Sequence, residues 1–110
     1  MDYPSITIDG KNIVMQPPKA RLYAVIRKHQ GAAEEGKLEA YAEIVAAAFR
    51  IRAAGGASPV DAILDNLGGG ELIGTAMRVM KIVNDSVAEE FERFPELKNA
   101  LERVQTKEAI

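Results

Sequence analysis

The side chains that most often perform catalysis are scarce in this sequence. Cysteine is absent and His29 is the only histidine, so one chain offers neither a thiolate nucleophile nor a paired-imidazole metal site. A single histidine near the end of a predicted helix is more often a capping or packing residue than a general base. The serines Ser5, Ser58 and Ser86 fall at predicted turns or helix caps, where backbone hydrogen bonding explains them. We therefore expect no catalytic residues and no metal site.

A run of glycines raises the question of a phosphate-binding loop. Gly68-Gly69-Gly70 precedes a predicted helix, but Glu71 and Leu72 follow, where a P-loop requires Lys and then Ser or Thr. A carboxylate at a helix N-terminus repels phosphate, so the glycines are interpreted as a hinge between helices. The adjacent acids Glu34-Glu35 and Glu89-Glu90 do not face each other on a helix, which gives paired-carboxylate catalysis little support. No cofactor is expected.

The overall composition is that of an ordinary globular protein. The chain has 110 residues, of which 47% are apolar and 27% charged, and this predicts a single domain over 1–110. No apolar run reaches the ~20 residues that a membrane helix needs. The first residues, Met1-Asp2-Tyr3-Pro4, lack the layout of a secretory signal. We expect a cytoplasmic protein without a membrane partner.

Charge is distributed unevenly along the chain. Residues 1–55 have eight Lys and Arg against six Asp and Glu, whereas residues 56–110 have six against ten, giving +2 and −4. These charges are either solvated helix faces or an acidic C-terminal half that attracts a basic partner surface. The net charge of −2 disfavours nucleic acid as the main partner.

A β-hairpin is predicted over residues 5–15. Ile6 and Ile8 alternate with polar neighbours, Asp9-Gly10 suits the positive φ angles of a tight turn, and Ile13-Val14-Met15 follows. A hairpin alone is marginally stable in water, so the helices must cover its apolar face.

The rest of the chain predicts a helical bundle over 18–105, so the fold class is mainly α: an N-terminal β-hairpin followed by about five helices in one small helical domain. Gly55-Gly56 is expected to stop the second helix, and Ser58-Pro59 to start the third. Ser86 with Glu89 predicts a capping box that starts the last helix, and Pro95 a kink within it. The predicted helices span residues 18–29, 37–54, 59–67, 71–84 and 87–105.

Two predicted helices, 37–54 and 71–84, are apolar around much of their circumference. Such helices are either central to the fold or provide an interface, and the sequence leaves both open. Met77 and Met80 are expected to fill the core rather than to form an adaptable surface.

Three stretches near the start of the chain follow one another in a recognisable pattern: Ile6-Thr7-Ile8-Asp9-Gly10-Lys11, Met15-Gln16-Pro17-Pro18 and Arg21-Leu22-Tyr23. In this pattern the chain resembles tail assembly chaperones of long-tailed bacteriophages and prophages, including gene-transfer-agent relatives. Beyond residue 30 the resemblance is architectural only. It implies a protein that binds the tape measure protein, a long helical polypeptide that sets tail length, and keeps it soluble until tube subunits polymerise around it. It also implies residence in the host cytoplasm, absence from the mature virion and, in many members, a longer frameshifted form.

The residues themselves favour the same mechanism, because surplus apolar helix surface can cover the apolar stripe of a helical client. The predicted contacts are Ile44 and Ile51, on the second side of helix 37–54, and Phe91 and Phe94 in the acidic last helix. The same surface can pair with itself, so a homo-oligomer is plausible. The alternatives are a virion structural or head–tail joining protein and a small DNA-binding regulator.

Overall fold

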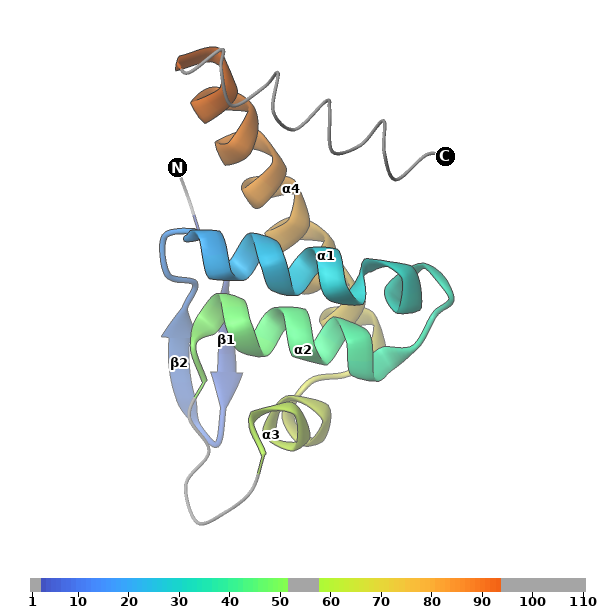
Figure 1. Cartoon of the computed structure of the whole chain (residues 1–110). Coiled ribbons are helices and arrows are strands. Elements are labelled where there is room, and N and C mark those ends of the chain that lie inside the picture. The colour runs from blue at the N-terminus through green and yellow to red at the C-terminus, as the bar shows by residue number, and fades with distance from the viewer. Residues whose placement is uncertain (1–2, 52–57, 94–110) are drawn as a thin grey trace.

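The computed structural model describes residues 3–51 and 58–93, which form a two-stranded hairpin followed by four helices (Figure 1). This confirms the mainly helical class and the N-terminal hairpin, whereas the expected number of about five helices is corrected to four in the described part of the chain. The elements are β1 (Ser5–Ile8), β2 (Lys11–Val14), α1 (Ala20–Glu34), α2 (Leu38–Phe49), α3 (Pro59–Asn66) and α4 (Gly69–Arg93).

The hairpin forms as its sequence predicts. β1 and β2 are antiparallel with Ile6 opposite Ile13. Asp9 and Gly10 have φ angles of 50° and 79°, the positive values that a two-residue type I′ turn requires. The side chains of Ile6 and Ile8 are buried, whereas the residues that alternate with them are exposed. The helices cover the apolar face of the hairpin, because both isoleucines belong to the same hydrophobic cluster as α2 and α3.

Asn66, the last residue of α3, ties that helix to the hairpin turn. The Asp9 backbone N–H donates to Asn66 Oδ1 at 2.9 Å, and Asn66 Nδ2 donates to Asp9 Oδ1 at 3.4 Å. The same amide nitrogen donates to the Ala62 carbonyl at 2.8 Å, within its own helix. One amide side chain therefore fixes the turn against the end of α3.

The first two helices end at other residues than expected. α1 continues to Glu34 rather than 29, because a helix tolerates a glycine such as Gly31 at a cost of about 1 kcal/mol. α2 stops at Phe49 rather than 54, since Arg50 takes a left-handed conformation with φ 51°. The Ile51 N–H then donates to the Ala46 carbonyl at 3.1 Å, the bond that closes a Schellman motif. Gly55-Gly56 lies outside the described residues.

The start of α3 agrees with the prediction, because Ser58 Oγ accepts the Asp61 N–H at 3.0 Å and Pro59 opens the helix. The prediction for α4 is wrong in two respects. Gly69 and Gly70 belong to its first turn, and the helix does not break at Asp85-Ser86.

α4 continues because its apolar spacing runs through the predicted break. Val79 and Val83 are buried, and Val87, one turn further, packs against the core. The intervening Asp85 is exposed, so nothing at this point opposes a helix. Ser86 lies inside the helix, so the capping box with Glu89 does not form. Pro95 and the remainder of the predicted last helix lie outside the described residues.

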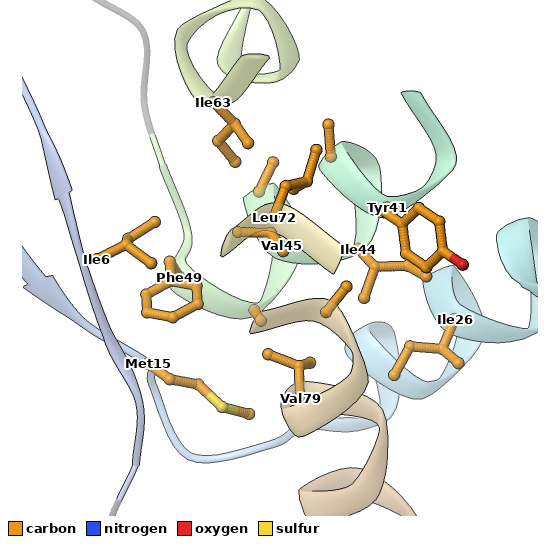
Figure 2. Close-up of a cluster of buried hydrophobic side chains, with 14 of the residues drawn as sticks. Ile6, Met15, Ile26, Tyr41, Ile44, Val45, Phe49, Ile63, Leu72 and Val79 are labelled. Atoms are coloured by element: carbon orange, nitrogen blue, oxygen red, sulfur yellow. The ribbon is translucent and has the colours of Figure 1, made fainter. Parts of the chain in front are cut away.

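α2 is the central helix of the fold. It packs against α1, α3 and α4, and eight of its twelve residues are buried. Several of these are alanines, whose small side chains let neighbouring helices approach closely. Figure 2 shows Ile6 pointing toward Phe49 and Met15 extending toward the helix that carries Val79. In the same view, Ile26 of α1 lies near Tyr41 and Ile44. The apolar circumference predicted for this helix is therefore used inside the molecule.

Candidate partner-binding site

An open cleft with an apolar floor lies where the chain passes from β2 into α1 and where α2 ends. Its volume is about 520 Å³. Buried and half-buried aliphatic residues form its floor, and its rim consists of exposed residues: one amide, one proline and three cations. The floor residues are Leu22, Ala47, Ala48 and Ile51, and the rim residues are Gln16, Pro17, Lys19, Arg21 and Arg50.

Two backbone features position the walls of the cleft. The Gln16 N–H donates to the Ala48 carbonyl at 3.2 Å, which joins the exit of the hairpin to the last turn of α2. Proline cannot continue a strand ladder, so Pro17 marks the point where the chain leaves the hairpin for α1. On the other side, the left-handed Arg50 turns the chain away from the helix axis immediately after Phe49. The early end of α2 therefore creates the mouth of the cleft.

All the charged side chains that line the described cleft are positive. Lys19, Arg21 and Arg50 are exposed on its rim, and no acidic residue lines the described cleft. None of the three cations forms an ion pair within the described residues. α1 also begins unusually: its first turn has no acidic residue, and its N-cap Lys19 makes no side-chain capping bond. Cations at a helix N-terminus oppose the helix dipole, so fold stability does not explain why Lys19 and Arg21 lie at the start of α1.

Of the four contact residues predicted from the sequence, the structure brings one to the cleft. Ile51 is half-buried and lines it. Ile44 is 0% exposed, because α1 covers the side of α2 that was expected to face a partner, and we withdraw it from the candidate surface. Phe91 lies within α4, where its side chain is not described, and Phe94 lies outside the described residues.

Sequence reasoning missed most of the cleft because its two walls come from distant segments. Gln16 to Leu22 form one wall, and Ala47 to Ile51 the other. A clue was present in Lys19 and Arg21, two cations directly after a Pro-Pro pair at the start of a helix, where acids are the usual choice.

Over 3–51 and 58–93, the other exposed apolar side chains do not form a comparable surface. Val14, Leu38 and Met77 are 48%, 40% and 56% exposed, and they belong to three different elements. Single exposed apolar residues are normal on protein surfaces. The exposure of Met77 corrects the expectation that it fills the core, whereas Met80 is half-buried against it.

The described residues offer few groups for chemistry. Over 3–51 and 58–93, no group of three or more His, Asp or Glu could hold a metal ion, and no polar or charged side chain is buried. His29 is half-buried within α1 rather than at its end, and Ser58 is occupied as the N-cap of α3. Among the described helices, none combines the length and apolar character that crossing a bilayer requires.

Comparisons with protein-family models, with curated proteins and with solved structures find no match to this chain. Its function is therefore inferred from the cleft and from the resemblance carried by residues 5–30.

Proposed function

We propose that this protein is a bacteriophage tail assembly chaperone, which binds helical segments of the tape measure protein and keeps them soluble in the host cytoplasm. The observation that carries the proposal is the open cleft, with its apolar floor and polar rim. Four of its nine lining residues, Gln16, Pro17, Arg21 and Leu22, belong to the stretches that resemble this family. Part of the segment that suggests the family thus contributes one of the two walls of the cleft.

The cleft suits helix-in-groove binding. A helical client places apolar side chains at positions i, i+3 and i+4, and these can enter over Leu22, Ala47 and Ile51. A cleft of about 520 Å³ accommodates only a few side chains, so one copy covers one or two turns of a client. A long tape measure protein would then be covered by many weakly bound copies. Weak binding at each site suits a chaperone that tube subunits must displace.

The proposal is tested by co-expressing the protein with a fragment of the tape measure protein of the same phage. We expect the soluble fraction of the fragment to rise several-fold, and to fall back with Ile51→Glu, which places a charge on the cleft floor. Arg21→Glu, at an exposed rim position, provides a second variant that leaves the core untouched. Leu38→Glu is the matched control, because Leu38 is an exposed apolar residue at the opposite end of α2.

Unchanged solubility of the fragment with the wild-type protein would contradict the proposal. So would equal loss with Leu38→Glu and Ile51→Glu, because binding would then not depend on the cleft. Mass spectrometry of purified virions separates the chaperone from a structural or head–tail joining protein. The chaperone is expected to be absent from the particles, whereas a structural protein would remain in them.

A further inference from the structure

The last turns of α4 form an acidic segment that extends past the body of the protein. Among the described side chains of α4 the buried ones end at Val83, and Val87 is the last that packs against the core. Figure 1 shows the helix continuing beyond α1. Four carboxylates are exposed on this stretch, and over 84–93 only Arg93 opposes them. The acidic residues are Asp85, Glu89, Glu90 and Glu92.

The acidic end of α4 and the cleft are complementary in charge. The cleft has three exposed cations and no acid among its described lining residues. Within the described part of the chain, these cations form no ion pair with the α4 carboxylates. From this complementarity we propose that the acidic end of α4 of one copy docks into the cationic cleft of a second copy.

The same copy cannot easily supply the helix end. α4 is continuous from Gly69 to Arg93, and Leu72, Ala76 and Val79 bury its first half against the core. The direction of the α4 end is therefore fixed by the continuous helix. The end could reach the cleft of its own copy only if α4 broke. A second copy meets no such constraint, because its orientation is free.

The expected contact is weak and depends on salt. Each exposed ion pair contributes little to the affinity, and salt screens it. One helix end in one cleft is smaller than a standard protein interface, so association should appear only at high protein concentration. Because the two surfaces differ, the contact is heterologous: each dimer keeps one free cleft and one free helix end, and growth can continue.

This inference uses the same cleft as the proposed function but does not need the tape measure protein. If both hold, a helical client and the α4 end compete for the cleft. Self-association would then cover the apolar floor when no client is present. The two ideas can fail separately, because self-association is measured on the purified chain alone.

Sedimentation velocity of the full chain tests the inference. At ionic strength ~0.01 M, where the Debye length is ~30 Å, we expect the average mass to rise with protein concentration. At ~1 M, where this length is ~3 Å, the protein should return to a monomer. A wild-type chain that stays monomeric at the highest soluble concentration and low salt would overturn the inference.

Two double variants test the pairing itself. Lys19→Glu with Arg21→Glu changes the cleft, and Glu89→Gln with Glu90→Gln changes the helix end. Each variant alone should associate roughly tenfold more weakly, the effect of losing two exposed ion pairs. Acids at the start of α1 suit the helix dipole, and glutamine is a good helix former, so both variants should fold.

Mixing the two variants gives the sharpest result. The mixture retains one intact cleft and one intact helix end, so it should form a 1:1 dimer that does not grow further. Lys28→Glu with Lys81→Glu is the matched control, because it makes the same charge change at exposed positions outside the cleft and should associate like the wild type. No dimer in the mixture, or equal loss in the control, would show that this pairing is wrong.

The measurements also distinguish the two proposals. A monomeric wild-type chain that still solubilises a tape measure fragment would refute only the self-association. A chain that associates through this pairing but leaves the fragment insoluble would refute only the chaperone function.

Discussion

The fold uses α2 and α4 differently, although the sequence predicts that residues 37–54 and 71–84 both form helices with apolar side chains around much of their circumference. α2 lies between three other helices, and its side chains are buried on nearly every face. α4 packs against the core as far as Val87, and among its described side chains the buried ones end at Val83. An apolar helix in a sequence is therefore not evidence of an interface. The number of neighbours decides how much of the surface of a helix remains for a partner, and the surface proposed here for a partner lies at the ends of helices.

The largest expected effect comes from truncating the centre of α2. Ile44→Ala should lower the free energy of unfolding by about 2–5 kcal/mol, because a fully buried side chain leaves a cavity. Met77→Ala, at an exposed position of α4, should change it by no more than about 0.5 kcal/mol. Urea denaturation followed by circular dichroism measures both. Similar losses of unfolding free energy for the two variants would contradict the idea that α2 is central and that α4 has an exposed side.

Proline at position 87 tests whether α4 is continuous. If a new helix began after Ser86, Val87 would be its first position and would tolerate proline. In a continuous helix, Val87→Pro removes a backbone hydrogen bond and costs about 3 kcal/mol locally. We expect a loss of helical circular dichroism and faster hydrogen exchange beyond residue 83, with Val87→Ala as the control. Unchanged helicity would show that α4 does break at Asp85-Ser86, as the sequence predicts.

The two helix starts allow a subtler comparison. α3 begins with a Ser58 cap, whereas α1 begins with Lys19, which does not cap. Lys19→Asp should therefore raise the free energy of unfolding by about 1 kcal/mol, through a new cap and a favourable dipole interaction. The same change should weaken cleft binding. Thermal denaturation and sedimentation of this one variant measure both effects, and stronger self-association would contradict the role assigned to the rim.

The smallest expected effect concerns DNA. The rim cations are few and the net charge is −2, so we expect no salt-dependent gel shift at low micromolar protein. A shift that Arg21→Glu abolishes would favour the regulator over the chaperone.

Local signals in the sequence predicted local structure well. Asp9-Gly10 specified the hairpin turn, and Ser58-Pro59 specified the start of α3, because each depends on a few adjacent residues. The helix ends were harder to predict. Nothing in the sequence marks Arg50 as left-handed, and the helix-stopping glycines that follow it suggested a later end.

The cleft could not be predicted in the same way. Its walls are separated by some 25 residues of chain and meet only because α1 and α2 pack against each other. Ile51 was predicted for its helical spacing, yet it lines the cleft after the helix has already ended. Ile44 was predicted by the same spacing, and α1 covers it.

Arg50 also has a consequence for how this protein would respond to selection in the laboratory. A left-handed residue at a helix end is usually glycine, and an arginine there is conformationally less favourable. Variants enriched for heat resistance alone should therefore acquire glycine at this position and lose a rim charge at the same time. At position 50, thermal stability favours glycine, whereas the proposed binding of a partner favours arginine.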